Sequence, residues 1–356
     1  MTELSIIGVD LAKRVFQVHG VDRDHKVIVQ KQILRSDVVA WFSKQTPCLV
    51  GMESCATSHY WAREISKLGH TVKLIPPAYV KPYVRRQKND RADAAAICEA
   101  VSRPSMRFVD VKTKDQQAIQ VLHRARALLV QQLTQTGNSL RAHLAEFGCS
   151  YPKGNLGLSQ AVNTAQDTTN TDIPAVARQA MFSLVEQLKT LKQEIMKLDK
   201  QMVTWHKSHA DSQRLATIPH IGAVTASAIV AAVGTGKQFK SGREFAAWIG
   251  LVPRQNSSGG KERLGRISKK GDTYLRKLLV MVATSQLRSH RIEKAPGGQW
   301  FGELLRRKSA RVASVALANK MARVAWAVLT KGESYRASTT TTGANALEKV
   351  LMTATT

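Results

Sequence analysis

Short apolar runs with polar breaks fill the first 34 residues. Residues 4–10, 14–21 and 26–33 are rich in β-branched residues, and each run has the length of one strand. Runs of this kind, separated by polar turns, predict a three-strand antiparallel meander. The helical spacing of Val38, Trp41 and Phe42 then predicts a short helix, for which Ser36 is the expected N-cap.

The next segment continues with strands and helices in alternation. Residues 47–54 and 71–75 predict buried strands on either side of a helix over residues 57–70, which Gly69 closes. The order β-β-β-α-β-α-β is that of the RNase H-like fold. An alanine-rich helix over residues 90–101 follows, with Asp90 as a candidate N-cap.

Helical periodicity dominates the middle of the chain. Apolar residues recur at helical spacing over residues 115–147 and again over residues 175–206. The segment between them, residues 150–173, is rich in Gly, Asn, Thr and Asp and predicts a loop. Two long helices joined by a loop indicate an antiparallel coiled-coil arm; a helical bundle within one globular domain is the alternative.

The C-terminal part begins with an apolar segment over residues 214–234. Its PHIG turn followed by an apolar helix resembles a helix-hairpin-helix, which offers backbone N–H groups to phosphate, although an ordinary αα-hairpin fits equally well. The uncharged stretch from Leu215 to Gly236 is interrupted by Pro219, His220 and Gly222. We therefore expect a buried helical segment and no membrane span.

A basic, glycine-rich segment follows. A helix that carries Phe245 and Trp248 is expected to end in a loop around Gly259 and Gly260, which leads into a basic helix that starts near Tyr274. Another helix is expected over residues 304–330. The last ~20 residues have low complexity and predict a flexible tail.

The charge of the chain adds a partner class. Its 356 residues contain 53 Lys and Arg against 26 Asp and Glu, a net charge of +27. Residues 1–213 hold 29 basic and 19 acidic residues, so residues 214–356 hold the other 24 and 7 and have the larger excess. This excess predicts binding of a polyanion through its phosphates, mainly by the C-terminal part; a merely soluble basic surface is the alternative.

Cysteines and the N-terminus bear on location. Cys48, Cys55, Cys98 and Cys149 form no CxxC pair and have no zinc-ligand spacing. Free thiols suit a reducing cytoplasm. The chain begins directly with a strand pattern, so no signal peptide is expected. We expect a cytoplasmic protein associated with the nucleoid.

Four carboxylates carry the strongest chemical signal. Asp10 and Glu53 each end an apolar strand, and Asp90 and Asp93 share one face of a helix. Carboxylate oxygens are the ligands that Mg²⁺ (or Mn²⁺) prefers, and one or two such ions would serve phosphodiester chemistry. A surface charge or a helix cap is the alternative for any single member, and for Asp90 alone a cap is favoured.

A serine pair lies in the glycine-rich loop. Ser257 and Ser258 precede Gly259 and are surrounded by cations. A serine needs a base or a metal to attack a phosphate, and no His or Asp pair lies nearby in the sequence. From the local sequence alone a passive role in a turn or a phosphate contact is favoured. The candidate nucleic-acid contacts are Arg254, Lys261, Arg263, Arg266, Lys269, Lys270, Arg276 and Lys277.

These motifs together resemble a known family. The segments GVDLAK with Asp10, GMES with Glu53 and KNDRADAAAI, followed by IPHIG and FAAWIGLVPRQNSSGGKERLGRISKKGDTYLR, resemble the DEDD-type insertion-sequence transposases, which include the Piv DNA invertase. The resemblance covers about residues 4–335. It implies a RuvC-like domain at 1–110, a coiled-coil arm at 111–210, a helical transposase domain at 211–335 and a tail at 336–356.

The resemblance also implies roles for residues. Asp10, Glu53, Asp90 and Asp93 would hold the metal, and Ser258 would be the nucleophile that links covalently to DNA, with Ser257 as its neighbour. Donor and target DNA would be the substrates. Some relatives are directed by a structured non-coding RNA, and strand exchange implies a homodimer or homotetramer. Cys55, after Glu53, departs from the small or Thr residues common in relatives, and we expect no consequence.

Two other functions remain open at the level of sequence. A RuvC-like endonuclease or junction resolvase would cut with carboxylates and water, without a covalent intermediate, and would leave the serine loop unexplained. A non-catalytic, basic DNA-binding protein would need only the charge, and would leave the four ordered carboxylates unexplained.

Overall fold

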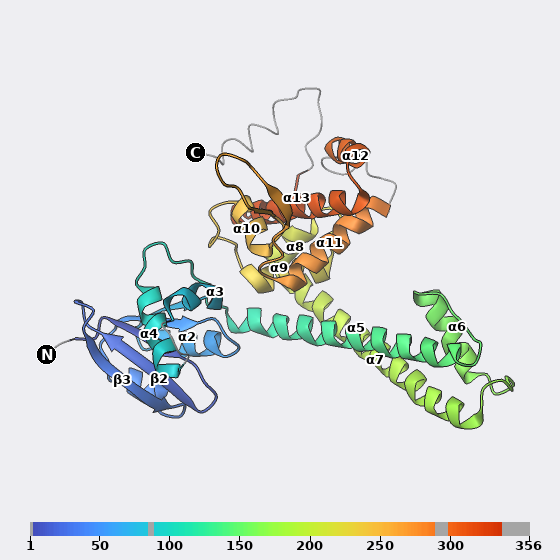
Figure 1. Cartoon of the computed structure of the whole chain (residues 1–356), viewed down its shortest axis with the longest axis horizontal. Helices are drawn as coiled ribbons and strands as arrows, with labels where there is room; N and C mark the ends of the chain where they lie inside the picture. The colour runs from blue at the N-terminus through green and yellow to red at the C-terminus, as the bar shows by residue number, and fades with distance from the viewer. Residues whose placement is uncertain (1–2, 85–88, 289–297, 337–356) are drawn as a thin grey trace. The chain divides into compact units, whose positions relative to one another are not determined.

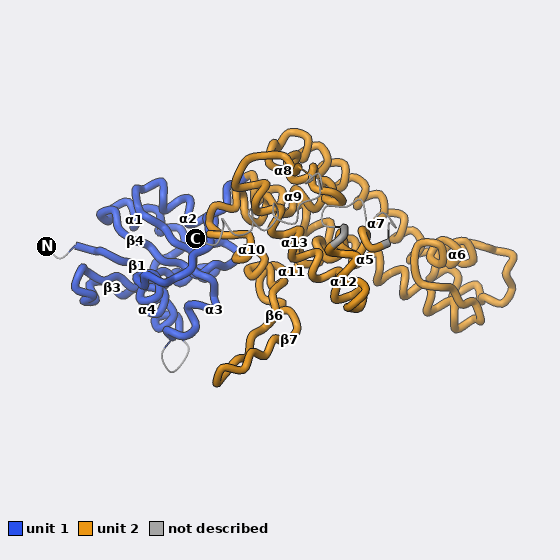
Figure 2. Tube along the Cα trace, turned by 90° about the horizontal axis from the view of Figure 1, so that it is seen from above, with its two compact units in different colours: residues 1–114 blue, residues 115–356 orange. Residues whose placement is uncertain are grey.

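The chain folds into two compact units. The computed structural model describes residues 3–84, 89–288 and 298–336 (Figure 1). The first unit spans residues 1–114 and the second spans residues 115–356 (Figure 2). The predicted tail lies almost wholly outside the described residues.

A five-stranded mixed sheet forms the first unit. Its strands are β1 (Ile6–Asp10), β2 (Val15–Val21), β3 (Val27–Leu34), β4 (Leu49–Glu53) and β5 (Thr71–Ile75), and their order is β3-β2-β1-β4-β5. Strands β1, β2 and β3 pair antiparallel, so the predicted meander is confirmed, while β1, β4 and β5 run parallel. This topology is consistent with an RNase H-like fold.

Apolar side chains cover one face of the sheet. Val9, Phe16 and Val50 pack there against α1 (Val38–Phe42) and α2 (Ser58–Ser66). The ring of Trp61, on α2, meets Phe16 edge-on with 5.0 Å between centroids. Because alternate residues of a strand point to opposite faces, Gly8 and Asp10 lie on the other face.

Helix α4 (Asp90–Val101) covers that second face. A Cβ atom added at Gly8 would lie 2.2 Å from the carbonyl oxygen of Ala94, and one added at Gly51 would lie 2.8 Å from Cβ of Val101. These two glycines therefore allow the helix backbone to approach β1 and β4 closely. Short elements α3 (Pro77–Val80) and η1 (Lys81–Tyr83) precede α4.

Two helix starts differ from the sequence prediction. The N-cap of α1 is Asp37, with no capping hydrogen bond from its side chain, and Ser36 donates its hydroxyl to Asp37 instead, at 2.8 Å. The N-cap of α4 is Asn89, whose Oδ1 accepts from the N–H of Ala92 at 2.8 Å. The cap prediction for Asp90 was therefore wrong, and its carboxylate is not used in that way.

Long helices open the second unit. Helix α5 (Lys114–Ala145) has 32 residues and α7 (Ala175–Ser208) has 34. The predicted loop between them was wrong in part, because it contains α6 (Asn155–Gln166). Ala161 and Ala165 of α6 are fully buried. They pack with Leu140 and Leu144 of α5 and with Val185 of α7, so α6 is a third helix packed against the two long ones.

The rest of the second unit has its own helical core. It contains α8 (Ala210–Ala216), α9 (Ala223–Val233), α10 (Gly242–Ile249), α11 (Thr273–Arg288), α12 (Gly298–Arg307) and α13 (Ala310–Lys331). Helix α9 is buried, as predicted for this uncharged stretch, and forms a hairpin with α8. One helix was expected over residues 304–330, but the chain forms α12 and α13, with Ser309 as the N-cap of α13.

Helix α13 is the one described helix that is long and apolar enough to cross a membrane. In this fold its Leu317, Met321 and Leu329 are buried in the core of the second unit with Phe245 and Leu279. Its apolar composition is thus accounted for by packing within the protein.

The glycine-rich segment is a β-hairpin, where a loop was predicted. Strands β6 (Pro253–Gln255) and β7 (Leu264–Ile267) pair antiparallel, and the hairpin projects from the helices of its unit (Figure 2). Gly259 and Gly260 have φ of 56° and 74°. Two successive residues of positive φ are typical of a type I′ turn, which matches the twist of paired strands.

Candidate functional site

Three carboxylates meet on the α4 face of the sheet. Oxygen atoms of Asp10, Asp90 and Asp93 all lie within 4.8 Å of one another. Asp10 is at the end of β1, and Asp90 and Asp93 lie in the first turn of α4, whose close approach at Gly8 brings them to that strand end. Residues 80 positions apart in the sequence are therefore brought together as expected.

The electrostatics of this cluster are unfavourable without a counter-charge. The pKa of Asp10 is raised from 3.8 to about 6, first by burial and then by repulsion from Asp93, Asp90 and Glu53. Neither Asp10, Asp90 nor Asp93 forms an ion pair with any basic residue that the structure describes. Adjacent carboxylates that repel one another and have no such partner are the setting in which a divalent cation binds.

Glu53 lies beside this cluster and is not one of the three clustered carboxylates. It ends β4, and the parallel register pairs Val9 with Met52, so Glu53 comes next to Asp10 at the same sheet edge. It is near enough to raise the pKa of Asp10. The four carboxylates thus fit the hard oxygen donor set that Mg²⁺ or Mn²⁺ takes, three of them with oxygen atoms within 4.8 Å of one another and Glu53 beside them.

Ser258 lies at the tip of the β6–β7 hairpin in the second unit. It pairs with Lys261 across the turn, and the Lys261 N–H donates to the Ser258 carbonyl at 3.1 Å. Directly paired residues point to the same face, so the Ser258 hydroxyl shares its face with the Lys261 side chain. Cβ atoms added at Gly259 or Gly260 would meet nothing within 4 Å, so no other group packs against the turn at these two positions.

Ser257 has a different environment. Its Oγ accepts a hydrogen bond from the backbone N–H of Arg263 at 3.2 Å. By alternation it faces away from Ser258 and Lys261. A hydroxyl that supports the hairpin backbone is a worse nucleophile candidate than one exposed beside a cation.

Most of the candidate nucleic-acid contacts are exposed and have no acidic partner among the described residues. None of them pairs with an acidic side chain in the described ranges, and the exposed members are Arg254, Lys261, Arg263, Arg266, Lys269, Lys270 and Lys277. Exposed cations without acidic partners are available to phosphates.

Arg276 also has a structural task. Its Nη1 donates to the carbonyls of Ile249 at 2.7 Å and Lys270 at 3.2 Å, which ties the end of α10 to the segment before α11. The Nη2 of Arg254 similarly donates to the carbonyl of Ser268 at 3.3 Å. These two arginines therefore position the hairpin and its flanks.

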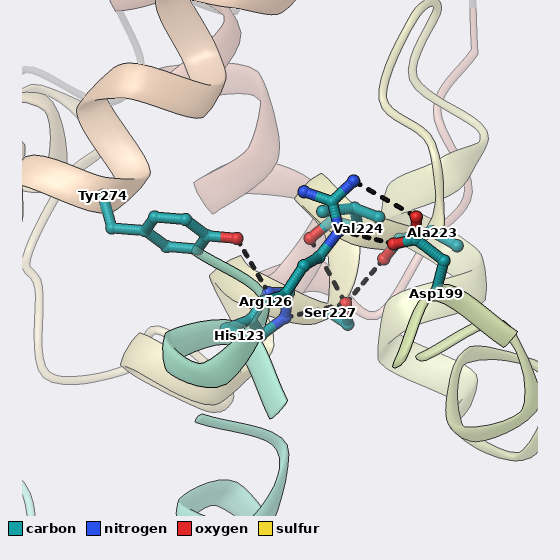
Figure 3. Close-up of polar contacts among 7 residues, drawn as sticks. All are labelled: His123, Arg126, Asp199, Ala223, Val224, Ser227 and Tyr274. Carbon is teal, nitrogen blue, oxygen red and sulfur yellow. Dashed lines mark hydrogen bonds and ion pairs between the residues drawn. The ribbon is translucent and has the colours of Figure 1, made fainter. Parts of the chain in front are cut away.

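A buried polar cluster, which the sequence did not indicate, lies elsewhere in the second unit (Figure 3). Nε2 of His123, on α5, is 3.0 Å from Ser227 Oγ on α9, and its Nδ1 is 3.1 Å from the Tyr274 hydroxyl on α11. The Ser227 hydroxyl donates to the Ala223 carbonyl at 2.7 Å. His123 therefore donates from Nε2 and accepts the Tyr274 proton at Nδ1.

This arrangement fixes helices and does not activate Tyr274. Burial raises the pKa of Tyr274 and lowers the pKa of His123 to about 4. Arg126 pairs with Asp199 beside them and joins α5 to α7. A phenol with a raised pKa that donates to a buried imidazole is a poor nucleophile, so Tyr274 is the weaker competitor of Ser258.

Two family models match this chain. The DEDD transposase model matches residues 7–148, which include all four carboxylates. The model of the IS116/IS110/IS902 transposase family matches residues 212–296, which include the β6–β7 hairpin and α11.

Curated relatives match along nearly the whole chain. A probable family 20 transposase of Pseudomonas aeruginosa is 47% identical over 94% of this chain and 99% of its own length. The transposases of insertion sequence IS1328 of Yersinia enterocolitica and IS1111A of Coxiella burnetii are 40% and 38% identical, each over 94% of this chain and over 99% and 92% of their own lengths. A pilin gene-inverting protein of Moraxella bovis is 39% identical over 19% of this chain and 22% of its own length. The chain therefore belongs to the IS116/IS110/IS902 family of insertion-sequence transposases, enzymes that cut and recombine DNA.

Proposed function

We propose that this transposase exchanges DNA strands at a divalent-metal site built from Asp10, Glu53, Asp90 and Asp93. The convergence of three carboxylates within 4.8 Å carries this proposal. A bound Mg²⁺ or Mn²⁺ would stabilise charge on the phosphate oxygens during an in-line displacement. Four residues would hold that ion: Asp10 at the end of β1, Glu53 at the end of β4, and Asp90 and Asp93 in the first turn of α4.

Ser258 is the proposed nucleophile. Its Oγ would form a bond to the DNA phosphorus as one P–O bond of the DNA breaks, so a phosphodiester is exchanged for a phosphodiester and no high-energy cofactor is consumed. Lys261, on the same hairpin face, would bind the phosphate. Glu262 is the one acidic side chain of the hairpin segment, which has no His or Asp; the carboxylates of Asp10, Glu53, Asp90 and Asp93, with the divalent ion that they would hold, are the proposed means of activating the hydroxyl.

The proposed partners are donor DNA, target DNA and a structured guide RNA. The exposed cations of the hairpin and of the start of α11 support this proposal, because each can neutralise a phosphate. We place this reaction in the cytoplasm, at the nucleoid. Affinity for either nucleic acid should fall steeply as salt is raised, and a fragment of residues 214–356 should retain most of the non-specific binding.

We also propose that the protein acts as a dimer or tetramer that packs through the long helices as a coiled-coil arm. Apolar residues are exposed seven positions apart on both helices: Val121 and Leu128 on α5, and Met196 and Val203 on α7. A seven-residue repeat is the spacing of a coiled-coil seam. Light scattering of the DNA-bound protein should show more than one protomer, and a monomeric active complex would contradict this.

The test of the metal assignment compares Asp10→Asn with the wild type on DNA carrying the element ends. The variant should bind that DNA with unchanged affinity and should not cut or join it in Mg²⁺. Full recombination by the variant would disprove the assignment. Metal-dependent cutting by the wild type without any protein–DNA adduct would favour a RuvC-like endonuclease, and binding without cutting would favour an architectural protein.

A further inference from the structure

A polar groove runs beside the carboxylate cluster in the first unit. It has a volume of about 670 Å³, and its wall includes Gln17 and Gln32 of the sheet and Asn89, Asp90 and Arg91 of α4 with its cap. Asp90 belongs to both the groove and the cluster, so the groove opens onto the proposed metal site.

The sheet register explains how the floor of the groove is built. Asp10 pairs with Gln17, and Gln17 pairs with Gln32, so one row crosses three strands. Side chains of directly paired residues lie on the same face, with Cβ atoms ~5 Å apart. The row therefore leads from the metal-site carboxylate to two successive amides.

Gln17 is the unusual member of this row. It is only 6% exposed, although a buried position on a central strand normally holds an apolar residue. Its Nε2 donates to the carbonyl of Lys31 at 3.1 Å, and no hydrogen bond from the described residues reaches its Oε1. A buried amide that is held by its nitrogen leaves the oxygen for a ligand in the groove.

The other groups fit the same kind of ligand. Asn89 uses its Oδ1 to cap α4, which leaves its amide N–H groups free to donate. Amides donate and accept hydrogen bonds, as base edges and sugar hydroxyls do, and they carry no charge that would neutralise the carboxylates of the proposed metal site. Two exposed cations, Lys31 and Arg91, line the groove. The Nζ atom of Lys31 lies over the Trp41 ring, 5.2 Å from its centroid, so Arg91 is the one that we expect to take a phosphate.

We infer that this groove binds the nucleotide next to the scissile phosphate, with its sugar or base on the amides of Gln17, Gln32 and Asn89 and its outer phosphate on Arg91. This inference rests on the proposed function, because it places the substrate strand across the carboxylate cluster. The same chemistry is offered by DNA and by RNA strands.

The test uses two glutamines of one strand. Gln30 and Gln32 are both exposed on β3 and on the same face, but only Gln32 lines the groove. A benzoylphenylalanine residue is placed at one or the other position of the full-length protein, without Mg²⁺, and is photolysed with a labelled 12-nucleotide DNA or RNA strand. Cross-linking should be strong at position 32 and weak at position 30. The nucleic acid that cross-links more strongly at position 32, DNA or RNA, identifies the occupant of the groove.

A kinetic measurement complements the cross-link. Gln32→Ala should raise the KM for DNA carrying the element ends roughly three- to tenfold, the loss of one hydrogen bond, and Gln30→Ala should leave it unchanged. Equal cross-linking at both positions, or equal KM effects, would overturn the groove assignment even if the wild type is active. A second outcome is also informative. If cross-linking is specific to position 32 but the wild-type protein shows no metal-dependent cutting, the proposed function is overturned and the groove assignment is retained.

Discussion

The carboxylate cluster and the serine hairpin are built by opposite means. The cluster is set by tight packing, because α4 reaches β1 only where Gly8 has no side chain. Ser258 is set by a turn, at the tip of a hairpin whose residues 253–266 are exposed. One region leaves negative charge without a described basic partner, and the other leaves positive charge without a described acidic partner.

This difference separates two kinds of sensitivity. Changes that disturb the packing of α4 should alter folding and metal binding together, because the same helix supports both, whereas a change confined to one carboxylate should alter metal binding alone. Changes at the hairpin tip should alter strand exchange without a measurable change in folding stability, because an exposed tip contributes little to a core.

The largest effect is expected for Asp93→Asn. It should lower strand exchange by at least about 10²-fold, as loss of one transition-state contact does. Because it removes repulsion from the cluster, it should not destabilise the metal-free protein. Mg²⁺ should raise the Tm of the wild type by mass action and leave that of the variant unchanged. A Tm of the variant that still rises with Mg²⁺ would place the ion elsewhere.

Gly8→Val should act through folding. Its Cβ would lie 2.2 Å from the Ala94 carbonyl, a backbone atom that can move only with α4. A loss of about 3 kcal/mol in the free energy of unfolding is expected, with loss of the Mg²⁺-dependent rise in Tm. Gly302→Ala, in α12, is the control: nothing lies within 4 Å of its added Cβ, and stability should not fall. Equal stability of both variants would show that α4 is not held by close packing.

The two units should also respond oppositely to acid. The pKa of His123 is lowered from 6.5 to about 4 in the fold, so the unfolded chain takes up the proton first and stability is lost as pH falls from 6.5 to 4. The full loss is about 3 kcal/mol. The pKa of Asp10 is raised from 3.8 to about 6 in the fold, so the folded protein takes up this proton first. Without metal, the contribution of Asp10 to folding stability therefore increases as the pH falls from 6 to 3.8.

Calorimetry of the wild type and His123→Gln at pH 7.5 and pH 5 isolates the histidine. The wild type should lose more stability than the variant on acidification, because glutamine does not titrate. An identical loss in both proteins would show that His123 is already protonated or is not buried in solution.

The smallest effect is expected at the turn. Gly259 has φ of 56°, which asparagine tolerates and a β-branched residue does not. Gly259→Val should lower strand exchange about tenfold, because ~1.4 kcal/mol of strain in the turn would shift the hairpin to locally open conformations, and the core should still unfold at an unchanged Tm. Gly259→Asn is the matched control and should retain activity. A drop in Tm for Gly259→Val would mean that the hairpin supports the core.

The sequence was sufficient for the sheet and for the convergence of three carboxylates, because strand alternation and strand-end positions follow from local periodicity. It did not reveal the hairpin, because the segment SSGGK fits a loop as well as a hairpin turn. Only the pairing of residues 253–255 with residues 264–267 makes this segment the turn of a β-hairpin. Helix α6 and the capping role of Asn89 also depended on tertiary packing and on the exact helix start. The His123 cluster joins three helices far apart in sequence, so no local pattern could indicate it.

The most direct test of the account is the site of a covalent protein–DNA link. DNA carrying the element ends is incubated with the protein in Mg²⁺, the adduct is trapped by denaturation, and the modified peptide is mapped by mass spectrometry. The account predicts a phosphodiester on Ser258 that is absent in Ser258→Ala, in Asp93→Ala and in wild type with chelator, while Ser257→Ala still forms it. An adduct on Ser257 or Tyr274, or recombination that proceeds with no adduct, would contradict it.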